Sequence, residues 1–129
     1  YHATMPTDSL RRFRDIMKET EEYGFEKVRA EQQELGDKVR EMLVAKGIKS
    51  VASDGFQAPG VVVSYTNDKG IQTGKKFAEL GFQIAAGVPL QCDEPEDYQS
   101  FRLGLFGLDK LHNIGRTVEK LEKALDAIY

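Results

Sequence analysis

A long apolar stripe runs at helical spacing through residues 25–46 of this 129-residue chain. Its members are Phe25, Val28, Leu35, Val39, Met42 and Leu43. This period predicts an amphipathic helix, and charged residues and glutamine crowd the opposite side. At 1.5 Å per residue the helix would be about 33 Å long, enough to lie across a small sheet. Gly47 is a typical residue just past the end of such a helix.

Two further helical patterns lie near the two ends of the chain. The first follows Pro6, starts among the helix-capping residues 7–9 and continues to about Glu22, with Gly24 breaking it. Its apolar residues are Leu10, Phe13, Ile16 and Met17. The second spans residues 113–128, and its apolar residues are Ile114, Val118, Leu121, Leu125 and Ile128. Both patterns predict helices.

The region between these helices favours strands. Residues 61–66 are β-branched or aromatic and are bounded by turn residues, which gives the clearest strand prediction. Shorter strands are expected at 48–52, 82–86 and 100–106, with a short helix at 73–80 and an exposed loop at 88–99. The order α-α-β-β-α-β-β-α predicts an α+β domain of two layers, in which helices pack on one face of a mainly antiparallel sheet. No repeat or linker divides the chain, so residues 1–129 are expected to form one domain.

Charge and composition exclude several classes of protein. A net charge of −3 and a pI near 5.4 give no basic patch for nucleic acid or an anionic membrane. No apolar run is long enough to cross a bilayer. Cys92 is the only cysteine, which excludes an internal disulfide and favours a reducing, cytoplasmic setting. The chain starts at Tyr1 without an initiator methionine, as an excised fragment would.

Arg102 is the most informative candidate for chemistry, because it is the one charge within the strand predicted at 100–106. Strand alternation puts Phe101, Leu103 and Leu105 on one face, and Arg102, Gly104 and Phe106 on the other. One interpretation is an arginine exposed to solvent. The other is a guanidinium that binds a ligand carboxylate through its planar fork of donors, with Gly104 leaving room for the ligand.

The opening residues Tyr1-His2-Ala3-Thr4-Met5-Pro6 offer hydroxyl and backbone donors that suit a phosphate, although a frayed terminus fits the same residues. His2 and His112 lack nearby metal-ligand partners, so no metal site is predicted. Cys92 lies in an acidic loop, where a thiolate is disfavoured. Every lysine falls on a charged helix face or in a turn, which argues against an imine-forming lysine. The residues alone therefore indicate an anion-binding set without a reaction centre.

Two segments carry a family resemblance. The strand Phe101-Arg102-Leu103-Gly104-Leu105-Phe106-Gly107 resembles the Arg-aliphatic-Gly-Leu-x-Gly strand of class V aminotransferases, which depend on pyridoxal 5′-phosphate. The opening Tyr1-His2-x-Thr4-x-Pro6 is similar to the segment that follows the large domain in that family. The alanine–glyoxylate and serine–pyruvate enzymes belong to this group. The chain therefore resembles their carboxy-terminal small domain, with residues 1–6 as a hinge and active-site segment and residues 7–129 as the body.

The resemblance implies a role for three residues. Arg102 would bind the α-carboxylate of the amino-acid and 2-oxo-acid substrates. Tyr1 and Thr4 would hydrogen-bond the cofactor phosphate across the interface of a homodimer. The imine-forming lysine would precede Tyr1, in a large cofactor-binding domain that this chain lacks. The chain alone is then expected to be inactive and not to hold the cofactor covalently.

Two alternatives stay open. Another class V enzyme, of the phosphoserine aminotransferase, kynureninase or desulfurase type, has the same general signature, although Cys92 is not in the small-residue context of a desulfurase cysteine. A standalone regulatory module that binds an amino acid through Arg102 is also compatible with the residues.

Overall fold

The computed structural model describes residues 4–129, so the predictions for Tyr1 and His2 lie outside the described residues. This part of the chain is a small α+β domain with six helices and a three-stranded antiparallel sheet. The elements are α1 (Thr7–Tyr23), α2 (Phe25–Ala45), β1 (Val61–Tyr65), α3 (Lys69–Gln72), α4 (Lys75–Glu79), β2 (Ala85–Ala86), β3 (Ser100–Gly104), α5 (Leu108–His112) and α6 (Ile114–Ile128).

The strand that carries Arg102 lies in the middle of the sheet. The strand order is β1-β3-β2, and both neighbours run antiparallel to β3. Arg102 has Val63 of β1 and Ala85 of β2 as its two register partners. Because side chains alternate between the two faces of a strand, this register fixes which residues surround Arg102.

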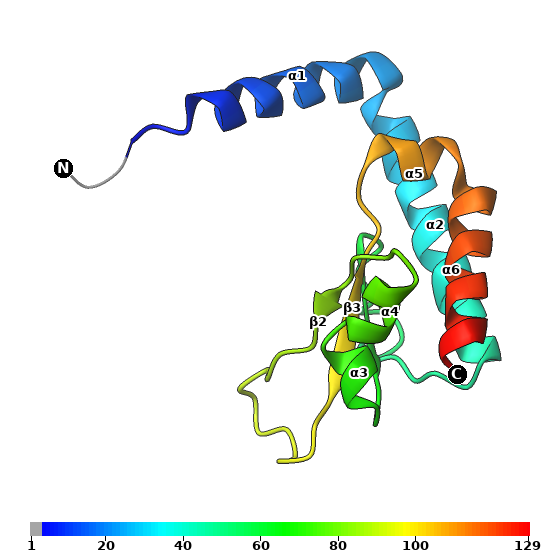
Figure 1. Ribbon diagram of the computed structural model, residues 1–129. Coiled ribbons are helices and arrows are strands. Elements are labelled where there is room, and N and C mark those ends of the chain that lie inside the picture. Colours follow the sequence, from blue (N-terminus) through cyan, green and yellow to red (C-terminus); the bar gives the residue numbers. More distant parts are fainter. Residues whose placement is uncertain (1–3) are drawn as a thin grey trace.

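One face of the sheet forms the core with the helices. Phe101, Leu103 and Leu105 are buried, as the alternation along residues 100–106 predicts. They belong to a single apolar cluster with residues of α2 to α6: Leu35, Val39, Met42, Leu43, Ile71, Phe77, Leu111, Leu121 and Leu125. Figure 1 shows α2 and α6 side by side beyond the sheet. The prediction of an α+β domain with an antiparallel sheet is confirmed.

The opposite face of the sheet is more open. Tyr65 and Gly104 are exposed there, and Val63 and Arg102 are half-buried. α1 takes no part in the core, because none of its residues is buried, and it extends away from the rest of the domain (Figure 1).

Glycines set the ends of the two long helices as expected. Gly24 has a φ of +104° between α1 and α2, and Gly47 has a φ of +73° after α2. Residues with side chains rarely adopt such angles, so each glycine provides a natural end to its helix.

The sequence predictions need correction at several elements. Residues 48–52 form no strand, only an isolated bridge between Ser50 and Ser64. The strand expected at 82–86 is limited to Ala85–Ala86. The helix expected at 73–80 is present as α4 (Lys75–Glu79), but the short helix α3 (Lys69–Gln72) before it was not predicted. The short helix α5 before α6 was not predicted. Within residues 4–129, no helix combines the length and apolar character that spanning a bilayer requires.

Candidate carboxylate-binding site

Arg102 stands on the open face of the sheet with its guanidinium held from one side. Its Nε donates a hydrogen bond of 2.9 Å to the carbonyl oxygen of Ala86, at the end of β2. Ala86 directly follows Ala85, the register partner of Arg102 on β2, so the pairing of β2 with β3 orients the guanidinium. The side chain is half-buried between Val63 and Ala85, its partners on the two neighbouring strands.

The two terminal nitrogens of Arg102 are available to a ligand. Among residues 4–129, neither of them takes part in a hydrogen bond or an ion pair. A guanidinium presents these nitrogens as a planar fork whose spacing matches the two oxygens of a carboxylate. Because Nε is already bound to Ala86, the orientation of the fork is set before any ligand arrives. This arrangement suits a bidentate pair with an anion on the open face.

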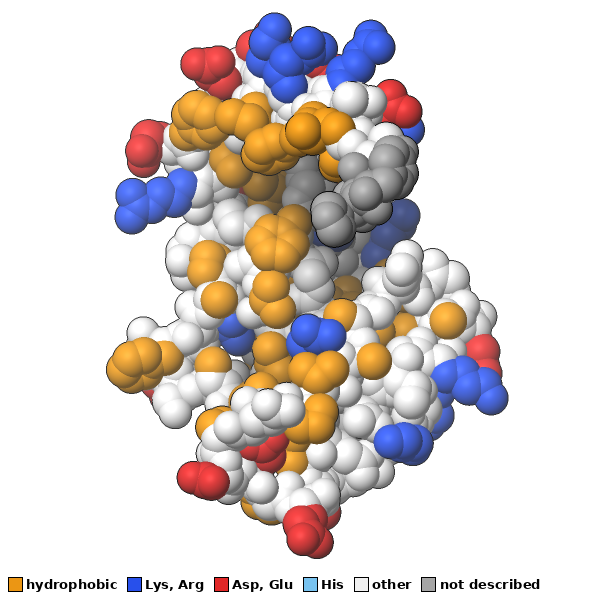
Figure 2. All heavy atoms as spheres, turned by 90° about the vertical axis from the view of Figure 1, so that its left-hand side faces the viewer, with side chains coloured by type: hydrophobic (Ala, Val, Ile, Leu, Met, Phe, Trp, Pro, Cys, Tyr) orange, Lys and Arg blue, Asp and Glu red, His pale blue; other side chains and the backbone are white. Residues whose placement is uncertain are grey.

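The strand next to Arg102 leaves space for such an anion. A β-carbon built on Gly104 would meet nothing within 4 Å, so the surface beside the arginine is open. Further along the same face, the ring of Phe106 packs against Gly60, where a β-carbon would lie 2.3 Å from a ring carbon. Figure 2 looks onto this side of the molecule and shows hydrophobic side chains from α1 down across the sheet, with basic side chains among them.

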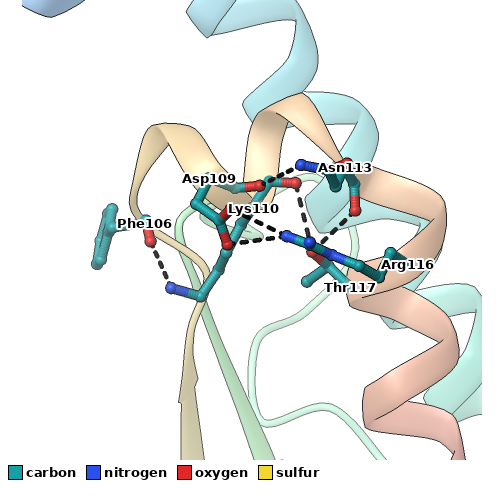
Figure 3. Close-up of polar contacts among 6 residues, drawn as sticks. All are labelled: Phe106, Asp109, Lys110, Asn113, Arg116 and Thr117. Atoms are coloured by element: carbon teal, nitrogen blue, oxygen red, sulfur yellow. Dashed lines mark hydrogen bonds and ion pairs between the residues drawn. The ribbon is translucent and has the colours of Figure 1, made fainter.

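A network of polar contacts orders the turn that follows β3. Lys110 Nζ donates to the carbonyl oxygen of Phe106 at 2.7 Å, and Arg116 Nη2 binds both carboxylate oxygens of Asp109 at 2.9 and 3.0 Å. Asn113 and Thr117 add bonds to backbone carbonyls at the junction of α5 and α6. Figure 3 shows these groups turned toward one another, with the Phe106 ring pointing away from them. The network joins α5 to α6 and supports the turn through Phe106.

The structure does not bring Thr4 to Arg102. Thr4 is exposed and precedes α1, which projects away from the sheet (Figure 1). Tyr1, the other residue expected at the cofactor phosphate, lies outside the described residues. A phosphate site built by Tyr1 and Thr4 in a second subunit stays a prediction.

The lysines of the chain do not fit the covalent anchor of pyridoxal 5′-phosphate. No lysine within residues 4–129 is buried. The three half-buried ones are already engaged: Lys46 with Asp126, Lys76 with Asp68 at 2.6 Å, and Lys110 with the Phe106 carbonyl. Imine formation needs an amine that is free to attack a carbonyl carbon. The described residues therefore include no lysine that is buried and without a polar partner.

The remaining candidates make no second site. Cys92 is a free, exposed thiol, and the ring of His112 lies 4.4 Å from that of Tyr23. No group of histidine, cysteine and acidic residues in the described part could hold a metal ion. Sequence reasoning missed Glu94, whose carboxylate accepts the N–H groups of Leu90, Gln91 and Cys92. These bonds, led by that from Cys92, lower the pKa of Glu94 to about 2.

Comparison with known proteins leaves the family unassigned. No model of a protein family matches the chain, and no curated protein matches it either. The site residues must therefore carry the functional interpretation.

Proposed function

We propose that this chain is the carboxy-terminal small domain of a class V, pyridoxal-phosphate-dependent aminotransferase. Its part in the enzyme is to bind the α-carboxylate of the amino-acid and 2-oxo-acid substrates through Arg102. The proposal rests on one observation above all. Arg102 is oriented by the carbonyl of Ala86, while its two terminal nitrogens face no partner within residues 4–129.

The exposed apolar surface supports the proposal as well. Phe106, beside the site, is 61% exposed, and Tyr65 on the same face of the sheet is also exposed. Large apolar side chains gathered on one face indicate a surface that another part of a protein covers. A large domain docked on this face would close the space at Gly104 and exclude water from the guanidinium.

The exclusion of water determines how strongly Arg102 can bind a substrate carboxylate. An arginine–carboxylate pair that is exposed to water contributes little to the free energy of binding. A pair that is shielded from water has a fixed geometry and binds more strongly. The cofactor would supply the electron sink for amino-group transfer, and its lysine would belong to the large domain. Arg102 would fix the substrate by its carboxylate and so determine which bonds at the α-carbon face the reacting groups.

Kinetics of the full-length enzyme test this role. Arg102→Ala should raise KM for both the amino donor and the 2-oxo acceptor, because losing a buried charged partner costs about 2–5 kcal/mol. The cofactor absorbance should stay unchanged. Arg116→Ala is the matched control, since Arg116 binds Asp109 at the α5–α6 junction and should leave KM unaltered. Unaltered KM in Arg102→Ala would remove Arg102 from the substrate site.

A standalone amino-acid-binding module is the second candidate, because the chain closes one apolar core from its own residues. Titration of the 129-residue chain with alanine or pyruvate, followed by NMR, separates the two. Micromolar binding that Arg102→Ala abolishes would favour the module. Binding no tighter than the millimolar range is expected if the missing large domain completes the site.

A further inference from the structure

A single residue joins the two long helices, with no loop between them. The N–H of Gly24 donates to the carbonyl oxygen of Thr20 in α1 at 3.0 Å, and its own carbonyl oxygen accepts from the N–H of Val28 in α2 at 3.0 Å. Gly24 therefore ends one helix and begins the next. Its φ of +104° and ψ of +116° lie where residues with a side chain rarely go, and they set the angle at which α1 leaves α2 (Figure 1).

Tyr23, the last residue of α1, ties this corner to the rest of the domain. Its hydroxyl donates to the carboxylate of Glu31 in α2, with distances of 2.9 and 2.7 Å to the two oxygens. Lys27 Nζ lies 4.1 Å from the centre of the Tyr23 ring, within cation–π range. The ring of His112 in α5 packs against the same ring, with centroids 4.4 Å apart. Tyr23 thus connects α1 to two other helices.

Little else holds α1 in its direction. Within residues 5–23, the side-chain hydrogen bonds, ion pairs and ring contacts that reach beyond the helix all come from Tyr23, because the other side-chain bonds of α1 stay inside it. No residue of α1 is buried, so the helix is not anchored in the core. At 17 residues, α1 is about 26 Å long, and a turn of about 20° at Gly24 would move its amino end by about 9 Å.

We propose that α1 is a lever that turns about Gly24, and that the side chain of Tyr23 is the clasp that holds it in the observed direction. In the clasped state α5 supports Tyr23 through His112, and the polar network between α5 and α6 keeps α5 in place. Loss of these contacts frees α1 to swing as a rigid helix, since the clasp uses only a side chain and no hydrogen bond of the helix backbone. A hinge of this kind needs only one or two backbone angles to change.

The lever has a consequence for the proposed function. Its free end carries Thr4, which the aminotransferase resemblance assigns to the cofactor phosphate of a second subunit. The direction of α1 would then determine where this segment reaches, so the clasp would control the completion of the cofactor site. This consequence rests on the proposed function, whereas the clasp rests on the contacts of Tyr23 alone.

Double electron–electron resonance on the 129-residue chain tests the clasp. Spin labels at Arg11→Cys in α1 and Lys120→Cys in α6 report the direction of the helix, in a chain whose native thiol is removed by Cys92→Ser. Both labelled positions are exposed, and neither side chain has a hydrogen bond or an ion pair among residues 4–129. The measurement needs neither cofactor nor Arg102, so its failure is distinct from a failure of the proposed function.

The chain with an intact Tyr23 should give one narrow distance distribution. Tyr23→Ala should make the distribution about twice as wide, because α1 then samples a range of angles. Tyr23→Phe should give an intermediate width, since it loses the bond to Glu31 and keeps the two ring contacts. Tyr65→Phe is the matched control, because it removes a tyrosine hydroxyl from the sheet and should leave the distribution unchanged.

Two results would overturn the clasp. One is a distribution in Tyr23→Ala that stays as narrow as that of the parent chain, which would mean that other contacts hold α1. The other is a parent distribution as wide as that of Tyr23→Ala, which would mean that α1 is not held at all. The circular dichroism of Tyr23→Ala should be unchanged, and a loss of helical signal would contradict a rigid lever.

The double variant Tyr23→Ala/Gly24→Ala tests the hinge. Alanine disfavours a positive φ and favours a helix, so α1 and α2 should merge into one straight helix. The distance distribution should then become narrow again, at a mean that differs from that of the parent chain. A distribution that stays as wide as in Tyr23→Ala alone would exclude Gly24 as the hinge.

Discussion

Gly87 lies directly against the carbonyl oxygen of Ser100, so closely that a β-carbon on Gly87 would sit 1.7 Å from that oxygen. The N–H of Gly87 also donates to the carbonyl of Gln72 at 3.0 Å, which ties the end of β2 to α3. Gly87 directly follows Ala86, whose carbonyl holds the Nε of Arg102. The close approach at Gly87 therefore fixes the position of the Ala86 carbonyl, which in turn orients Arg102.

Gly87→Ala should destabilise the domain and disturb the candidate site. The added methyl group has to push β2 away from β3, and overpacking of this kind costs about 1–3 kcal/mol. The free energy of unfolding in urea measures this cost. Gly104→Ala is the matched control, because a β-carbon there meets nothing within 4 Å, and it should change stability by less than about 0.5 kcal/mol. Equal effects at Gly87 and Gly104 would contradict the close packing of β2 on β3.

A pair of phenylalanines tests where the core lies. Phe101 is fully buried beside Phe77, with ring centroids 6.0 Å apart, whereas Phe56 is 84% exposed. Phe101→Ala should therefore lower the free energy of unfolding by about 3–5 kcal/mol. Phe56→Ala should change it by no more than about 0.5 kcal/mol. Thermal or urea denaturation compares the two, and a large loss in Phe56→Ala would mean that the loop after α2 packs more tightly than described.

The sequence predicted the long helices well because their signals are local. The apolar period of α1 and α2 and the glycines at 24 and 47 act within a few residues of each boundary. The strand expected at 48–52 failed for the opposite reason. It makes only the bridge from Ser50 to Ser64, and the length of a strand depends on how far a distant partner runs beside it. The helix expected at 73–80 corresponds to α4, which begins directly after Gly74 in its left-handed conformation.

The candidate site was predictable only in part. Alternation along residues 100–106 gave the correct face for Arg102, since Phe101 and Leu103 on either side are buried. The hydrogen bond to Ala86 was not predictable, because it joins residues 16 apart through a register that no local pattern encodes. The same holds for α5, whose five residues are too few to show a period.

The loop between β2 and β3 should respond to acid through Glu94. Its carboxylate accepts hydrogen bonds from the backbone N–H groups of Leu90, Gln91 and Cys92 at 2.5–2.8 Å, and these hold its pKa near 2, below the ordinary value of 4.5. A carboxyl group with a depressed pKa stabilises the fold while it is ionised. This contribution should be complete above about pH 4.5 and should be lost as the pH falls toward about 2.

NMR measures both parts of this prediction. The carboxyl carbon of Glu94 should titrate with a midpoint near pH 2, and the amide signals of Gln91 and Cys92 should move with the same midpoint. Glu94→Gln removes the charge and should shift those amide signals at neutral pH. Glu96→Gln is the matched control, because it removes one charge from the same loop and leaves the three hydrogen bonds intact. A Glu94 midpoint near 4.5 would mean that its carboxylate does not hold the loop, since the depressed pKa arises chiefly from these backbone donors.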